Sequence, residues 1–198
     1  DISIAAGGTY EVTATNTLTG CETTKTIVVN ESEFPLFDLD DLTVFDLTGD
    51  GSNRIEVLTG IGALGIGDYE FALDGGAYQN SPVFEDVPPG IHQVSVRDKN
   101  GCGTKSVAAS VIGYPLYFTP NGNGQDDNWH VLGVNGIFQS QSLIYIFDRH
   151  GRLLAQIKTN GPGWDGTYNG TPMPADDYWF RVGLEDGRTF TGHFSLIR

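Results

Sequence analysis

Short runs of β-branched and aromatic residues, each closed by a glycine-containing turn pair, limit what this chain of 198 residues can fold into. Glycine occurs 27 times, and pairs such as Asp74-Gly75 and Asn100-Gly101 stand between the apolar runs. Such pairs supply the positive φ angles that tight hairpins need. No long stretch repeats its apolar residues at helical spacing, so the sequence predicts an all-β fold of tandem sandwich modules.

Residues 1–32 are predicted to form a single hairpin. Its strands are expected at 9–14 and 25–29, with a turn near Thr19-Gly20. Because two strands alone are marginally stable in water, we interpret this segment as the terminal hairpin of a preceding immunoglobulin-like (Ig-like) domain. Residues 30–35 are the expected linker. The chain begins at Asp1 without a leader segment, which is expected of a piece of a longer protein.

Residues 34–113 predict a module with short strands at regular spacing. The expected strands are 43–45, 54–58, 69–73, 83–84, 90–96 and 105–112. Alternating residues share one face along two of these strands, at Tyr69, Phe71 and Leu73 and at His92, Val94 and Val96. Alternation of this kind marks half-buried strands. An Ig-like sandwich of about 80 residues fits the pattern.

The chain is acidic, with 25 Asp and Glu against 11 Lys and Arg and a net charge of −14. Residues 1–113 hold 17 of the acidic and 5 of the basic residues. Nucleic-acid binding depends on neutralising phosphates, and anionic lipid attracts basic segments. The composition therefore argues against nucleic-acid partners and direct lipid insertion. No run of 18 apolar residues is present to span a membrane as a helix.

The two cysteines, Cys21 and Cys102, each follow a glycine in a turn of a different segment. A disulfide requires Cα atoms within about 7 Å of each other. Turns at equivalent places of successive modules are not expected to touch, so we expect no disulfide between these two residues.

Residues 114–198 form a further module, whose hairpins can be aligned from the pattern of apolar positions. Cross-strand partners share a face, and a two-residue Asp186-Gly187 turn would place Phe190 on the wrong one. Three-residue loops that contain a left-handed glycine restore the match. They predict the pairs Val182–Phe190 and Tyr178–Phe194 around loop 185–187, and Phe147–Leu153 and Asp148–Arg152 around loop 149–151.

A glycine-rich loop offers side-chain oxygens at every second residue, namely Asn121, Asn123, Gln125 and Asp127. Such spacing can wrap calcium, although calcium prefers several carboxylates. The alternative is a turn in which these side chains bond their own backbone. A weaker calcium candidate runs from Asp46 to Glu56, with Arg54 in its midst.

Motifs for catalysis are not found. The histidines, which are scattered without the spacing of a zinc site, are His92, His130, His150 and His193. Ser195 does not stand on the Gly-x-Ser-x-Gly turn that presents a nucleophile. The sequence therefore predicts no enzyme and no catalytic residues.

Three tryptophans, Trp129, Trp164 and Trp179, are crowded into the last module. Trp179 falls on the face opposite the apolar stripe, together with Arg181. It can pack under the 163–170 loop, or it can form an exposed aromatic–arginine pair for docking, since Trp and Arg dominate interface hot spots. An alternative function is a calcium-stabilised adhesive or carbohydrate-binding module in which the three tryptophans are sugar platforms.

Several segments of this module stand in a characteristic order: Tyr114–Pro120, Asn121–Gly124, Ile146–Leu154, Gly163–Gly170, Pro174–Phe180 and Gly192–Arg198. In that order and spacing, residues 114–198 resemble the type B C-terminal sorting domain of type IX secretion, also called the gliding-motility-associated C-terminal domain. The segment 34–113 is similar to the Ig-like repeats of gliding adhesins in its runs 69–76, 87–90 and 96–103.

The resemblance implies an export signal rather than a catalyst, with no cofactor. It implies recognition by the outer-membrane type IX translocon and a PorP/SprF-type β-barrel partner, and delivery through the periplasm to the cell surface or the medium. An unpaired final strand would also suit a partner that adds a strand. The predicted contact residues, centred on the terminal hairpin, are Trp179, Arg181, Phe190, His193, Phe194, Leu196 and Arg198.

Overall fold

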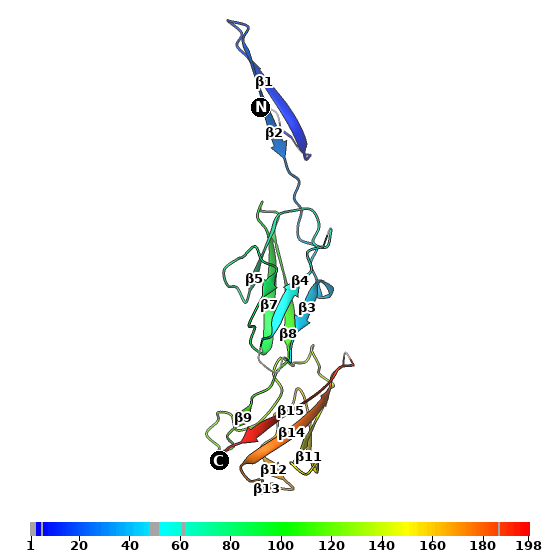
Figure 1. The fold of residues 1–198 in the computed structure, drawn as a ribbon. Coiled ribbons are helices and arrows are strands. Elements are labelled where there is room, and N and C mark those ends of the chain that lie inside the picture. The colour runs from blue at the N-terminus through cyan, green and yellow to red at the C-terminus, as the bar shows by residue number, and fades with distance from the viewer. Residues whose placement is uncertain (1–2, 5, 48–51, 61, 186) are drawn as a thin grey trace.

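The structure is a computed structural model that describes residues 3–4, 6–47, 52–60, 62–185 and 187–198. Figure 1 shows an N-terminal hairpin, a central module and a C-terminal module in succession. The described residues form β-strands and one short 3₁₀ helix, so the predicted all-β fold is confirmed. Within those residues, no helix is long and apolar enough to cross a membrane.

The N-terminal hairpin pairs β1 (Gly8–Thr15) with β2 (Glu22–Val29) in antiparallel register. Gly20, with a φ of 71°, lies in the turn between the strands. None of the described residues of the hairpin belongs to a hydrophobic cluster of the molecule. Side chains such as Val12 and Val28 are exposed instead. Backbone pairing holds this hairpin, with almost no apolar burial.

The segment after the hairpin is anchored to the central module. The Glu33 N–H donates to the Ile66 carbonyl at 2.8 Å, and the Ile66 N–H donates to Glu33 Oε1 at 2.7 Å. The Ser32 hydroxyl donates to the Asp98 carboxylate, which also accepts from the Cys102 N–H at 3.0 Å. These bonds, that of Ser32 first, lower the pKa of Asp98 to about 2 although its burial opposes the shift. Residues 32 and 33 of the expected linker are therefore fixed in place.

The central module is a sandwich of two three-stranded sheets. One sheet has the order β3 (Leu42–Phe45), β4 (Arg54–Val57) and β6 (Val83–Phe84), and the other has the order β5 (Tyr69–Leu73), β7 (Gly90–Asp98) and β8 (Thr104–Val111). The 3₁₀ helix η1 (Leu39–Asp41) precedes β3. Ile55, Val94 and Val96 lie fully buried in the cluster between the sheets. Every strand expected from the sequence is present, with small differences at the ends.

The C-terminal module is built on one five-stranded sheet in the order β11-β10-β14-β15-β9. All neighbours are antiparallel except β15 and β9, which are parallel. The strands of this sheet are β9 (Tyr117–Phe118), β10 (Leu143–Phe147), β11 (Leu153–Lys158), β14 (Asp176–Gly183) and β15 (Thr189–Leu196). A separate small pair consists of β12 (Thr167–Tyr168) and β13 (Thr171–Pro172).

The registers predicted for these hairpins are confirmed. The observed pairs are Val182–Phe190 and Tyr178–Phe194 between β14 and β15, and Phe147–Leu153 between β10 and β11. Gly187 has a φ of 88°, as the three-residue loop requires, while Asp186 lies outside the described residues. Arg152 Nε donates to Asp148 Oδ2 at 3.1 Å. Because Arg152 is half-exposed, this pair helps to set the register more than it adds stability.

The two cysteines are both free and exposed, which confirms that they do not pair with each other. Cys21 lies in the hairpin turn. Cys102 lies between β7 and β8, and its Sγ is 3.2 Å from the Ser32 carbonyl oxygen.

Candidate functional site

The central strand β14 divides its side chains between two faces of the C-terminal sheet. Tyr178, Phe180 and Val182 are buried on the inner face, with exposed fractions between 0% and 2%. Trp179 and Arg181 alternate with them and are exposed on the opposite face. The period-two pattern of the sequence therefore separates a core stripe from an outer face.

Two tryptophan-bearing loops cover the inner face. The backbones of Trp129 and Trp164 bond each other, with N–O distances of 2.9 and 2.8 Å. The Trp129 ring stacks on Phe194, with centroids 4.0 Å apart. Trp129 Nε1 donates to the Pro115 carbonyl at 2.9 Å, and Trp164 Nε1 donates to the Thr167 carbonyl at 2.8 Å. The two rings are 0% and 3% exposed, so the prediction that they are sugar platforms is wrong.

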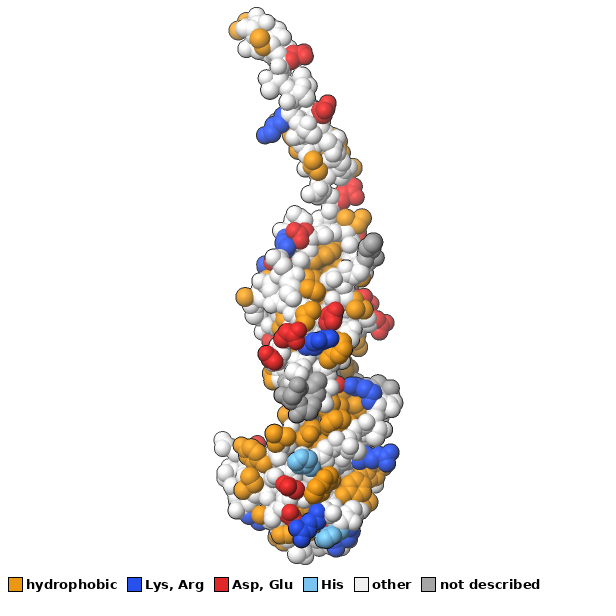
Figure 2. Space-filling model, in the orientation of Figure 1, with side chains coloured by type: hydrophobic (Ala, Val, Ile, Leu, Met, Phe, Trp, Pro, Cys, Tyr) orange, Lys and Arg blue, Asp and Glu red, His pale blue; other side chains and the backbone are white. Residues whose placement is uncertain are grey.

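Trp179 is the exposed tryptophan among the three. It is 41% exposed, and its ring centroid lies 6.3 Å from that of His193 on the neighbouring strand. The 163–170 loop instead packs its own Trp164 against Tyr178 and Phe194 on the inner face, opposite Trp179. Trp179, Arg181 and His193 therefore lie together on the outer face. Figure 2 shows hydrophobic, histidine and basic side chains close together on the C-terminal module.

The other predicted contact residues lie elsewhere. Phe194 and Leu196 are 0% and 2% exposed in the core, and Phe190 packs against the same cluster. Arg198 Nε donates to the Met173 carbonyl at 3.0 Å. Phe194 and Leu196 present almost none of their surface to a partner, and the partly buried Phe190 supports the module by packing against their cluster.

The final strand β15 is paired, so the condition stated for strand addition is not met at its end. β15 pairs with β14 along its length and with β9 at Ser195 and Leu196. The Ser195 N–H donates to the Leu116 carbonyl at 2.9 Å, and the Ile197 N–H donates to the Phe118 carbonyl at 3.0 Å. The parallel strand β9 therefore occupies the edge of β15 at Ser195 and Leu196.

The loop considered for calcium bonds its own backbone. Both oxygens of Asp127 accept backbone N–H groups of the loop, at distances from 2.6 to 2.9 Å. Asn121 Oδ1 accepts from the Asn123 N–H at 3.0 Å, and Asn123 Oδ1 accepts from the Gln125 N–H at 2.8 Å. The N–H bonds, that of Gly122 first, hold the pKa of Asp127 below its usual value. The geometry is that of the self-bonded turn, which the sequence left open as the alternative to calcium.

The weaker calcium candidate between Asp46 and Glu56 falls partly on residues 48–51, which lie outside the described residues. Its first carboxylate, Asp46, is bonded to Arg188 Nη1 at 2.5 Å. In the part of the chain that the structure describes, no group of three or more His, Cys, Asp or Glu side chains could hold a metal ion.

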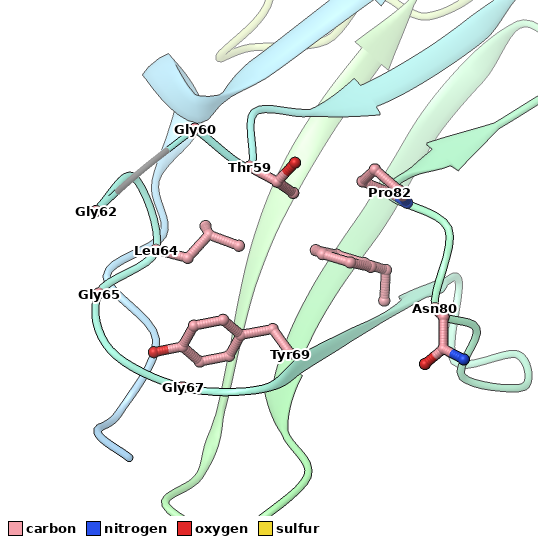
Figure 3. A pocket seen from close by; sticks show the side chains of 10 residues that line it. Thr59, Gly60, Gly62, Leu64, Gly65, Gly67, Tyr69, Asn80 and Pro82 are labelled. Atoms are coloured by element: carbon pink, nitrogen blue, oxygen red, sulfur yellow. The ribbon is translucent and has the colours of Figure 1, made fainter. Parts of the chain in front are cut away.

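A hollow of about 390 Å³ opens on the central module, and Figure 3 shows its lining. Leu64, Phe71 and Pro82 contribute apolar side chains, and glycine backbone forms much of the rim. No histidine, carboxylate, lysine or cysteine stands among its described lining residues. Tyr69, the titratable residue there, donates its hydroxyl to the Ile66 carbonyl at 3.0 Å, and burial raises its pKa. This lining offers no general base at neutral pH.

His92 is a buried structural histidine. Its Nδ1 lies 2.7 Å from Asp74 Oδ2, and its Nε2 lies 2.8 Å from the Pro88 carbonyl oxygen. Both ring nitrogens of this β7 residue are thus engaged, one by Asp74 just after β5 and the other by Pro88 just before β7. The remaining histidines are exposed and stand apart in the chain, as their scattered positions predicted.

The two modules share a junction that sequence reasoning missed. Leu47 of the central module has a φ of 56° and packs against the core of the C-terminal module. The side chain of Asp46 is 1% exposed and accepts from Arg188 Nη1 at 2.5 Å and from the Ile112 N–H at 3.0 Å. Asp46 and Arg188 are 142 positions apart, and no local pattern announces such a pair.

The fold and these contacts define a β-sheet module that presents one face of its sheet to solvent. Residues 112–196 match the family model of the CHU_C type IX secretion signal domain. The C-terminal module therefore matches the type IX secretion signal family, which confirms the type IX part of the resemblance stated from its sequence. This is a family of signals and not of catalysts. The type B subclass and the likeness of residues 34–113 to adhesin repeats stay predictions. The match begins at Ile112, which already belongs to the core of this module.

Similar solved structures are more distant. Dimeric latent PorU from Porphyromonas gingivalis is 16% identical with a TM-score of 0.31, covering 100% of this chain and 24% of its own. The BSP domain of a biofilm-associated protein is 14% identical with a TM-score of 0.28, and the match covers 80% of this chain and 30% of that structure's chain. Tp47, the 47-kilodalton lipoprotein of Treponema pallidum, is 10% identical with a TM-score of 0.27, and the match covers 90% of this chain and 55% of that structure's chain. These scores are too low to support a conclusion, and no curated protein matched the sequence.

Proposed function

We propose that the C-terminal module is the export address of a larger protein and is read by the type IX translocon at the outer membrane. The observation that carries this proposal is the match of residues 112–196 to the type IX signal family. A PorP/SprF-type β-barrel is the partner that the type B resemblance favours. The protein then passes through the periplasm and reaches the cell surface or the medium.

The central module and the hairpin act in this proposal as parts of an Ig-like stalk between cargo and signal. The acidic balance of residues 1–113 supports a solvated spacer that does not adhere to anionic surfaces. The exposed apolar side chains of the hairpin, such as Val28 at 64%, fit a segment that completes a neighbouring β domain. The stalk carries no enzymatic activity, in keeping with the lining of its hollow.

The calcium-dependent adhesive alternative loses its main support. Trp129 and Trp164 are buried, and the carboxylate of Asp127 is already an acceptor for its own loop. The export proposal needs neither feature.

Reporter export tests the proposal. A fluorescent protein with a Sec signal is fused to residues 1–198 and expressed in a type IX-competent host and in a translocon-deficient strain. We expect the reporter outside the cell in the competent host alone, and in neither strain when the fusion ends at residue 111. Retention of the full fusion in the periplasm, while a known sorting domain is exported beside it, would refute the proposal in that host.

A further inference from the structure

The outer face of the C-terminal module is a sheet surface whose side chains are exposed or partly exposed. It is defined by Leu143 and Tyr145 of β10, Lys158 of β11, and Trp179, Arg181 and Gly183 of β14. The register places Tyr145 beside Arg181, and Leu143 between Lys158 and Gly183. None of these residues belongs to a hydrophobic cluster of the described chain. Trp179 is 41% exposed, and Leu143 and Tyr145 are partly exposed, so part of their apolar surface is available to a second molecule.

Gly183 keeps a hollow open in this face. It pairs with Leu143 on one side and with Thr189 on the other, so it lies inside the sheet. A glycine inside a sheet weakens the strand, and such positions often mark the close approach of another molecule. A Cβ built on Gly183 would meet no atom within 4 Å. The hollow has a volume of about 310 Å³, and its lining includes Leu143, Tyr145 and Leu184.

Two cations on this face have no carboxylate partner. Arg181 and Lys158 form no ion pair or side-chain hydrogen bond in the described part of the chain. Glu185 at the rim of the hollow already accepts the Gln141 N–H on Oε1, at 2.6 Å. The arginines of this module that do pair with an aspartate are Arg149, Arg152 and Arg188. In a chain of net charge −14, unpaired cations gathered beside an apolar hollow favour an acidic partner.

We propose that the outer face docks an extended acidic segment of a protein of the export machinery, an inference that rests on the function proposed above. An apolar side chain of that segment fills the hollow over Gly183, and its carboxylates pair with Arg181 and Lys158. Trp179 adds a half-exposed ring, and Trp, Tyr and Arg dominate interface hot spots. An anionic membrane is a poorer occupant, because the net charge of −14 opposes its approach.

The test compares variants of the full 1–198 reporter fusion. Gly183→Trp fills the hollow without left-handed backbone strain, and Arg181→Glu with Lys158→Glu reverses the charge of the face. Gly136→Trp is the matched control for bulk, since a Cβ there also meets no atom within 4 Å in the same module. The matched control for charge is Lys25→Glu with Lys105→Glu, outside this module. Thermal unfolding followed by circular dichroism verifies that each variant is folded.

We expect the two outer-face variants to lower translocon-dependent export roughly tenfold or more, with both controls near wild type. If the wild-type fusion is exported and the outer-face variants equal it, the docking inference is overturned while the proposed function stands. A wild-type fusion that is not exported overturns both. An effect of Gly183→Trp without an effect of charge reversal overturns the acidic character of the partner.

Two further results would also overturn the inference. Equal losses in the control variants would show that export is not specific to this face. Binding of the full chain to phosphatidylglycerol vesicles that disappears on charge reversal at Arg181 and Lys158 would assign the face to anionic lipid instead of a protein segment.

Discussion

Replacement of Asp46 by alanine should destabilise the C-terminal module although the residue belongs to the central one. The carboxylate is buried, with 1% of the side chain exposed, and it accepts from the Ile112 N–H at 3.0 Å and from Arg188 Nη1 at 2.5 Å. Asp46→Ala leaves both donors without this acceptor. The neighbouring Leu47 continues to pack against the C-terminal core, so the variant isolates the polar part of the junction.

The magnitude follows from the two bonds. A buried N–H that loses its acceptor costs about 1–3 kcal/mol, and Ile112 is 1% exposed. Arg188 is 48% exposed, so its ion pair adds no more than about 1 kcal/mol. We therefore expect Asp46→Ala to lower the free energy of unfolding by about 1–4 kcal/mol. Asp46→Asn keeps an oxygen acceptor for Ile112 and should cost about 1 kcal/mol.

Denaturant unfolding of the full chain, followed by tryptophan fluorescence, measures this loss. The chain contains 3 tryptophans, all in the C-terminal module, so the signal reports on that module alone. Asp68→Ala is the control, because its pair with Lys99 is exposed and should contribute about 0–1 kcal/mol. An Asp46→Ala curve that coincides with that of Asp68→Ala would refute the junction argument. Equal losses in Asp46→Ala and Asp46→Asn would refute the assignment to the Ile112 bond.

Four other expectations can be measured on the same chain. Gly133→Ala should lower the free energy of unfolding by at least about 2 kcal/mol, because the new Cβ would lie 2.2 Å from a carbonyl oxygen of β8 and the backbone has a φ of 78°. Unfolding followed by fluorescence measures this loss, and a loss no larger than that of Gly136→Ala would contradict the argument. The pKa of Asp98, about 2, lies below its value in the unfolded chain, so the stabilisation by this carboxylate is present above about pH 4 and is lost as the pH falls toward 2. The loss of stability with falling pH, followed by circular dichroism, should therefore be shallower in Asp98→Asn than in the wild type. Parallel curves for the two proteins would disprove this linkage. Calcium at about 10 mM should leave the melting temperature unchanged, and a rise that Asp127→Asn abolishes would establish a site in loop 121–127. Amides of β1 and β2 should exchange much faster than those of β7, because none of the described hairpin residues joins a core; equal protection by mass spectrometry would show hidden burial.

Local chemistry explains why strand positions and registers could be predicted. Alternation along 178–184 fixes which residues share a face, and Gly187 fixes the length of the loop. Both signals lie within a few residues of the pairs that they determine, such as Val182–Phe190. The strands of the central module were found for the same reason.

Long-range placement could not be predicted in the same way. The parallel pairing of Ser195 with Tyr117 joins the last strand to a two-residue strand that has no pattern of its own. The contact of Asp46 with Arg188 depends on how two modules meet. Phe194 was expected to contact a partner, although its place on the apolar stripe already indicated burial. The prediction for Phe194 followed the resemblance to a terminal signal, whereas the alternation along the strand predicts the buried position that is observed.

The outer face exists only in the folded module. Tyr145, Lys158 and Arg181 come from three strands and adjoin one another through strand pairing alone. In an extended chain, β14 alone offers Trp179, Arg181 and Gly183, without the strand β10 that walls the hollow. A partner that reads this face therefore distinguishes a folded signal from an unfolded one. Leu47 packs against the core of this module and Asp46 bonds Arg188 and Ile112, so unfolding of the preceding module would remove contacts that support the folded signal.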